Sequence, residues 1–150
     1  MILKPNMVLP GLTCPLQEEV KEVAVGEQQY QVRLTDRKQD ELEDVEEVAD
    51  ATVRCLLRAV PAAVPGIAFL SGGQSAELAS ARLNAMNVRF KSRLPWAFSF
   101  SFARAIQQPA LEIWQGAEAN VSAAQQALYH RARCNRAARR GEYNAAMERI

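Results

Sequence analysis

Three apolar segments of the sequence each end in residues that suit phosphate or carbonyl chemistry. Lys4 follows the apolar run "MIL" and precedes Pro5, which ends a strand because proline donates no ladder hydrogen bond. The run "GIAFL" ends in "SGG", where glycines let backbone N–H groups approach an anion closely. The run "PWAFSFSFA" delivers Arg104, and a guanidinium fits phosphate bidentately. The candidate site residues are therefore Lys4, Ser71, Gly72, Gly73 and Arg104.

A lysine at a strand end can act as a Schiff-base nucleophile where burial or neighbouring cations lower its pKa. Taken singly, each signal also has an ordinary reading: Lys4 as a solvated cap, "SGG" as a turn, Arg104 as part of a surface salt bridge. Together they carry more weight, because barrels of parallel strands often build a phosphate site in the loops after their last two strands. The combination predicts a Schiff-base enzyme for a phosphorylated carbonyl compound.

Amphipathic patterns between these runs predict the helices that position them. Apolar residues recur every three or four positions from about Leu42 to Val60, the stripe of a helix that packs on a sheet. Further helices are expected from Ser75 to about Asn87, near Arg104 to Trp114, and from about Asn120 to Arg140, before a terminating Gly141. Strand and helix alternate, which predicts an α/β fold with parallel strands and right-handed crossovers.

Residues 14–41 depart from this alternation. The stretch "YQVRL" within them has a two-residue period, which predicts a surface hairpin or excursion inserted into the α/β pattern. The three remaining strands cannot close a barrel, and a parallel sheet needs cover on both faces and protected edges. The sequence therefore suggests the rear portion of a larger enzyme.

Composition limits the partners and the cellular location that we expect for the protein. A net charge of +1 over 150 residues gives no global field that would favour nucleic acid or an anionic membrane. No stretch approaches the roughly 20 apolar residues of a membrane span. The cysteines Cys14, Cys55 and Cys134 have irregular spacing and no CxxC or other metal-like neighbour, so we expect reduced thiols, no metal and a cytoplasmic protein.

Four motifs, in this order, resemble the class I fructose-1,6-bisphosphate aldolases: "ILKPNMV", "GIAFLSGGQS", "ASARLNAMN" and "PWAFSFSFARAIQ". The resemblance implies the C-terminal part of a (β/α)8 TIM barrel, namely its last three strands and helices. Residues 1–150 would form one partial aldolase domain with an insertion at about 14–41. It also implies a lyase without a cofactor that cleaves fructose 1,6-bisphosphate, a small sugar phosphate, in glycolysis.

The resemblance also assigns roles to residues. Lys4 would form the Schiff base with the ketose phosphate, and the "LSGG" loop would bind its phosphate together with the pair Ala103 and Arg104. Ala103 stands where the family usually has glycine. The family's acid-base carboxylates lie on earlier strands that this sequence does not contain. We therefore expect little or no turnover from the 150-residue chain, and a homo-oligomer when the protein is complete.

Two other readings stay open. The run "HRARCNRAARR" could be a basic helix that follows nucleic-acid phosphates, although cations also complement a helix C-terminus and no aromatic residues are interleaved for base stacking. The chain could instead be a non-catalytic interaction protein, a truncated barrel whose exposed edge is covered by a partner.

Overall fold

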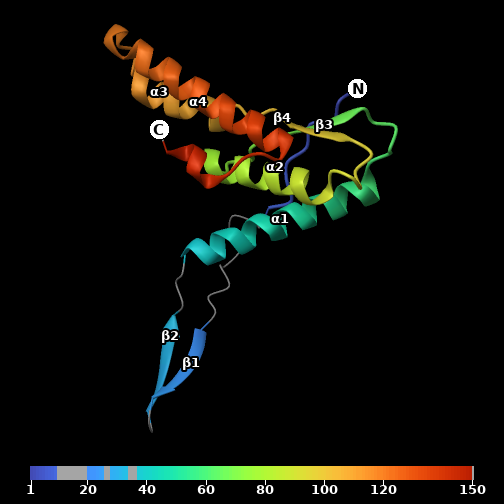
Figure 1. Cartoon of the computed structure of the whole chain (residues 1–150), viewed down its shortest axis with the longest axis vertical. Helices are drawn as coiled ribbons and strands as arrows, with labels where there is room; N and C mark the ends of the chain where they lie inside the picture. Colours follow the sequence, from blue (N-terminus) through green and yellow to red (C-terminus); the bar gives the residue numbers. More distant parts are fainter. Residues whose placement is uncertain (10–19, 26–27, 34–36, 150) are drawn as a thin grey trace.

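Four helices and a small parallel sheet pack together, and a separate hairpin stands away from them (Figure 1). The structure is a computed structural model that describes residues 1–9, 20–25, 28–33 and 37–149, with side chains described for residues 1–9 and 45–149. Its elements are β1 (Val20–Val25), β2 (Gln28–Arg33), α1 (Arg37–Ala59), β3 (Gly66–Phe69), α2 (Ala76–Phe90), β4 (Ala97–Phe100), α3 (Arg104–Trp114), the 3-10 turn η1 (Glu118–Asn120), α4 (Val121–Arg140) and the 3-10 turn η2 (Ala145–Glu148).

β3 and β4 pair in parallel, as the α/β pattern predicts. Gly66 lies opposite Ala97 and Phe69 lies opposite Phe100, so both strands end at the same level. The first expected strand, the run "MIL" that ends before Pro5, is wrong as a regular strand, because residues 1–9 make a single parallel bridge, between Leu3 and Ile67. The described chain thus has two regular parallel strands rather than three.

Pro5 explains why the first segment is reduced to a bridge. The Leu3 N–H donates to the Gly66 carbonyl at 3.2 Å, and the Leu3 carbonyl accepts from the Ala68 N–H at 2.9 Å. The ladder continues on one side only, where the Leu70 N–H donates to the Pro5 carbonyl at 2.9 Å. The next bond would need a proton on the Pro5 nitrogen, which proline does not have. The segment nevertheless runs parallel to β3, so its place beside that strand agrees with the prediction.

The core lies on one face of this sheet. Because of the strand register, Ile67, Phe69, Phe98 and Phe100 share the face that packs on the helices, and the Phe69 and Phe98 rings meet edge to face with centroids 5.1 Å apart. The buried helical residues of this core are Val48, Ala49, Val53 and Leu56 of α1, Ala79, Leu83 and Met86 of α2, Ala105 of α3 and Ala138 of α4.

The opposite face of the sheet carries small residues that are not fully covered. Ala68 and Ser99 are half-buried there, and Ala97 is exposed. The sequence predicts buried strands, whereas these strands alternate between buried and accessible positions. Among the residues that the structure describes, cover comes from one side only.

Local helix signals in the sequence are confirmed. Ser75 caps α2, because its Oγ accepts from the Leu78 N–H at 3.2 Å, and Gly141 ends α4 with a positive φ of 78°. α1 begins at Arg37, earlier than its apolar stripe indicates and inside the predicted excursion. No helix of the described residues is long and apolar enough to cross a membrane.

The predicted hairpin is confirmed where the structure describes it. β1 and β2 pair antiparallel, with Val20 opposite Arg33 and Val25 opposite Gln28. Residues 10–19, 26–27 and 34–36 of the predicted 14–41 excursion, or next to it, lie outside the described residues. That the hairpin is an insertion stays a prediction.

A buried ion pair joins the last turn of the chain to two helices. Arg131 of α4 is 4% exposed, and a buried charge needs a partner of opposite charge. Its guanidinium pairs with the Glu148 carboxylate of η2. It also donates to the Ala76 carbonyl and to Ser80 Oγ of α2, both at 3.0 Å. The Tyr143 hydroxyl donates to Glu148 Oε1 at 2.7 Å. Burial opposes ionisation of Glu148, but the hydrogen bonds from Tyr143 and Arg131 outweigh it and lower the pKa of the carboxyl.

A pair of leucine substitutions tests the position of the core. Leu83→Ala in α2 removes a fully buried side chain and should lower the free energy of unfolding by about 2–5 kcal/mol. Leu57→Ala in α1 makes the same chemical change at a side chain that is 47% exposed, and should cost less than about 1 kcal/mol. Urea unfolding followed by circular dichroism measures both, and equal losses would contradict the described core.

The Glu148 carboxylate should contribute stability that depends on pH. Because folding lowers its pKa, its contribution is complete above the unfolded value, near 4.5, and is lost as the pH falls through the lower folded value. Glu148→Gln should therefore destabilise the protein by roughly 1–3 kcal/mol at neutral pH and by much less in strong acid.

Urea titrations at neutral pH and in strong acid provide the measurement. The buffer is treated with a chelator, so that no metal ion contributes to stability. Glu142→Gln is the control, because Glu142 pairs with Arg140 at 2.9 Å on an exposed surface where such pairs contribute under about 1 kcal/mol. A Glu148→Gln effect of the same size in acid and at neutral pH would show that the ionised carboxylate is not the cause.

Candidate functional site

A pocket of about 290 Å³ lies where β3 and β4 end. Its walls come from three segments that are far apart in the sequence but adjacent in the sheet. The lining residues are Asn6, Leu70, Ser71, Gly72, Gly73, Ser101, Ala103 and Arg104. Arg104 is the single charged residue among them, so the pocket favours an anion.

The "SGG" segment forms a tight turn at the rim. The Gln74 N–H donates to the Ser71 carbonyl at 3.0 Å, and the Gln74 side-chain amide donates to the same oxygen at 2.8 Å. Gly72 and Gly73 both have positive φ, at 60° and 87°, which glycine adopts without strain. A Cβ at Gly72 would lie 2.7 Å from Asn6 Oδ1, so the missing side chain is what lets the Asn6 amide pack against this turn.

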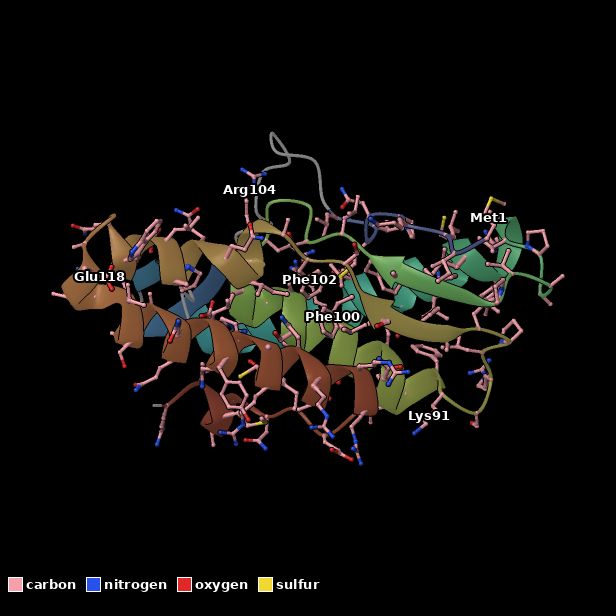
Figure 2. All side chains as sticks on the ribbon, turned by 90° about the horizontal axis from the view of Figure 1, so that it is seen from above. Met1, Lys91, Phe100, Phe102, Arg104 and Glu118 are labelled. Carbon is pink, nitrogen blue, oxygen red and sulfur yellow. The ribbon has the colours of Figure 1, made fainter. Side chains whose placement is uncertain are left out.

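Arg104 begins α3 on the other side of the pocket. Its side chain is exposed and points away from α4 (Figure 2). Ala103 precedes it as the N-cap residue and has no side-chain capping bond. Its φ is −103°, so this position does not need the left-handed backbone conformation that favours glycine. The helix N-terminus and the guanidinium thus favour negative charge at the same point.

The structure brings together five of the six predicted site residues. Ser71, Gly72, Gly73, Ala103 and Arg104 all line the pocket, whereas Lys4 is exposed and is not among the lining residues. Asn6 takes the place nearest to it, two residues further along the same segment. Lys4 thus belongs to a segment that reaches the pocket, but its own side chain is not part of the pocket lining.

Leu70, Ser101 and Asn6 line the pocket but are not among the candidate residues named from the sequence. For Ser101 a signal existed, because it directly follows the strand that delivers Arg104. Asn6 could have been found from its two-residue spacing to Lys4. Both side chains offer neutral hydrogen-bonding groups, which complement a bound anion or a sugar hydroxyl.

Comparison with known proteins decides the family. A family model described as "Fructose-bisphosphate aldolase class-I" matches residues 29–150, which is most of the chain. The chain belongs to the class I fructose-bisphosphate aldolase family. The resemblance seen in the sequence motifs is confirmed.

Individual relatives support the same family assignment. Fructose-bisphosphate aldolase B of Sparus aurata is 44% identical over 95% of this chain and 32% of its own length. The cytoplasmic isozyme 2 of Pisum sativum is 46% identical over 97% of this chain and 33% of its own length. This chain therefore spans about one third of the length of these relatives.

A solved structure supports the aldolase-like arrangement of the chain. The fructose-bisphosphate aldolase of Plasmodium falciparum, solved in complex with TRAP and a small-molecule inhibitor, superposes with a TM-score of 0.72 at 38% identity. The match covers 96% of this chain and 34% of the aldolase chain. The fold of this chain is accordingly that of a segment of an aldolase.

The pocket should bind inorganic phosphate through Arg104. Arg104→Gln removes a charge-assisted hydrogen bond worth roughly 1.5–3 kcal/mol and should weaken binding by about 10- to 100-fold. Arg93→Gln is the control, because Arg93 is equally exposed but lies over the Phe90 ring, away from the pocket lining. Isothermal titration of each variant with phosphate gives the comparison, and equal losses in both would point to a nonspecific effect of positive charge.

Proposed function

We propose that this chain carries the Schiff-base lysine and one phosphate subsite of a fructose-1,6-bisphosphate aldolase, as the last strands and helices of a (β/α)8 barrel. The observation that carries the proposal is the pocket in which the Ser71–Gly73 turn meets Arg104, beside the segment that holds Lys4. Turn amides, a helix N-terminus and a guanidinium together complement a phosphate dianion.

Lys4 is the proposed nucleophile. Its Nζ would attack the ketone carbon of the sugar phosphate, and loss of water would give an imine that is protonated. The C4 hydroxyl then loses its proton to a base, the C4 carbonyl forms, and the electron pair of the breaking C3–C4 bond passes to the cationic imine to give an enamine. Glyceraldehyde 3-phosphate leaves. Protonation of the remaining enamine and hydrolysis then release dihydroxyacetone phosphate and restore the lysine. Binding of the phosphate next to Lys4 would hold the carbonyl within reach of the amine.

Turnover by the 150-residue chain alone should be very low. Lys4 is exposed, whereas an efficient Schiff-base lysine needs a desolvated site or neighbouring cations. The chain also spans about one third of the length of its relatives, so the remaining two thirds have no counterpart in it.

We propose that the complete protein is cytoplasmic, as the name of the Pisum sativum isozyme states for that protein. We also propose that it is a homo-oligomer.

Chemical trapping tests the role of Lys4. Incubation with dihydroxyacetone phosphate and borohydride should reduce an imine to a stable amine, and peptide mass spectrometry should find the added mass on Lys4. Lys4→Met should lose the adduct, while Lys91→Met should keep it, because Lys91 is an exposed lysine at the far end of α2. Labelling that is equal on Lys4 and Lys91 would refute a built site. Turnover of fructose 1,6-bisphosphate at rates usual for enzymes would instead refute the predicted inactivity of the short chain.

A non-catalytic interaction protein is the second candidate. It is favoured by the half-covered face at Ala68 and Ser99 and by the outer edge of β4, which pairs with no strand of the described residues. Absence of a Lys4 adduct, together with co-purification of a longer chain, would support it. The nucleic-acid reading is weaker, because Arg131 of the basic helix is buried in the ion pair with Glu148.

A further inference from the structure

Three side chains with metal-binding atoms meet at the C-terminal end of the chain, remote in sequence from the phosphate pocket. His130 and Cys134 are four residues apart on α4, so they share one face of the helix. Glu148 reaches them from η2. One ligand atom from each residue lies within 4.8 Å of the other two.

The spacing fits a small divalent cation. His130 Nε2 lies 3.7 Å from Cys134 Sγ and 3.7 Å from Glu148 Oε2. Zinc bonds of about 2.0–2.3 Å at tetrahedral angles would place such ligand atoms about 3.4–3.6 Å apart. The two distances from His130 would have to shorten by a few tenths of an ångström, and the Cys134–Glu148 distance, which is at most 4.8 Å, by up to about 1 Å, for one cation to bond all three atoms. We propose that His130, Cys134 and Glu148 form a three-ligand site for a borderline divalent cation, specifically Zn²⁺, that ties η2 to α4.

The surrounding residues hold the carboxylate in place. Glu148 Oε1 accepts from the Tyr143 hydroxyl at 2.7 Å, and Oε2 accepts from Arg131. A carboxylate has about four acceptor positions, so a lone pair remains on Oε2 for a cation. Contacts of this kind orient ligands in zinc sites and raise their affinity. Arg131 is itself fixed by α2, so the carboxylate is presented from a rigid frame.

Charge balance decides which cation suits the site. The guanidinium of Arg131 repels any cation, and Glu148 alone cannot offset it. A metal that takes a thiolate brings a second negative charge, because Cys134 S–H loses its proton to solvent as the S–metal bond forms. Zn²⁺ with one thiolate and one carboxylate is then neutral, and the Glu77 carboxylate, 3.9 Å from Arg131 Nη1, offsets part of the Arg131 charge. Mg²⁺ and Ca²⁺ do not favour sulfur, so this set selects against them.

The position of Cys134 suits metal binding, but its raised pKa opposes the loss of the thiol proton. Its side chain is fully buried, and its Sγ lies 3.7 Å from His130 Nε2 and 3.9 Å from the Met147 carbonyl oxygen. Burial raises the pKa of the thiol, and the negative charge of Glu148 raises it further, so the metal must displace a proton. Entry is possible past His130 and Glu148, whose side chains are 18% and 19% exposed.

Titration of the full chain with Co²⁺, as a spectroscopic substitute for Zn²⁺, tests the proposal. One equivalent should produce visible bands of tetrahedral cobalt and a near-ultraviolet thiolate-to-cobalt band. Zn²⁺ should displace the cobalt and raise the melting temperature, since it binds the folded state. Mg²⁺ should do neither. Absence of the thiolate band, or binding of Mg²⁺ in its place, would overturn the proposal.

Matched variants locate the site. His130→Asn and Cys134→Ser should abolish the thiolate band or weaken binding by about 100-fold or more, while Cys55→Ser, at an exposed cysteine of α1, should change nothing. Tyr143→Phe keeps all three ligands and should weaken binding by about 10- to 100-fold through the carboxylate. Far-ultraviolet circular dichroism confirms folding of each variant. Cobalt binding that survives in folded His130→Asn would refute the site even if Cys134→Ser does not fold.

Discussion

The parallel register of β3 and β4 is the constraint on which the candidate site depends. Phe69 and Phe100 stand opposite each other as the last residues of the two strands. The Ser101 N–H donates to the Phe69 carbonyl at 2.7 Å and carries the pairing one residue further. The chain then leaves both strands at the same edge, into the Ser71–Gly73 turn on one side and into α3 on the other. A shift of the register by one residue would turn the side chains to the other face and separate the walls of the pocket.

The register in turn depends on packing against one face of the sheet. Phe69 and Phe98 are buried and in edge-to-face contact, and each buried aromatic side chain of this size contributes roughly 1.5–3 kcal/mol. The other face carries the small side chains of Ala68 and Ser99, which offer little apolar area to bury. The described sheet is therefore held by its aromatic face, through α1 and α2. The Leu3 bridge adds only a partial ladder, because Pro5 interrupts it.

Features set by neighbouring residues could be predicted from the sequence, and features set by distant ones could not. The cap at Ser75 and the stop at Gly141 depend on local backbone chemistry, so their residue types were enough. The parallel order of the strands follows from the helices between them. The stop of the first strand at Pro5 also follows from a local rule and was expected, whereas the reduction of that strand to one bridge at Leu3 was not.

Contacts across long separations escaped sequence reasoning. The side chain of Asn6 packs against Gly72, and no periodic pattern links these positions. Cys134 was judged to have no metal-like neighbour, although His130 lies one helical turn before it. The carboxylate that completes the group comes from a 3-10 turn after the helix has ended, so the His–Cys spacing alone could not show it. Lys4 was expected to converge with the phosphate loop, and it instead lies exposed beside the pocket.

α2 connects the Ser71–Gly73 turn to α4. The Ser71 turn is held by Gln74, whose side-chain oxygen accepts from Arg82 of α2 at 2.7 Å. α2 is fixed against α4 by buried bonds, from Ser80 Oγ to Asn135 Oδ1 at 2.7 Å and from Asn87 Nδ2 to the Ala138 carbonyl at 3.2 Å. The turn that would bind phosphate is thus an extension of a packed helix. Its glycines supply the shape of the turn, while the buried bonds between α2 and α4 supply its rigidity.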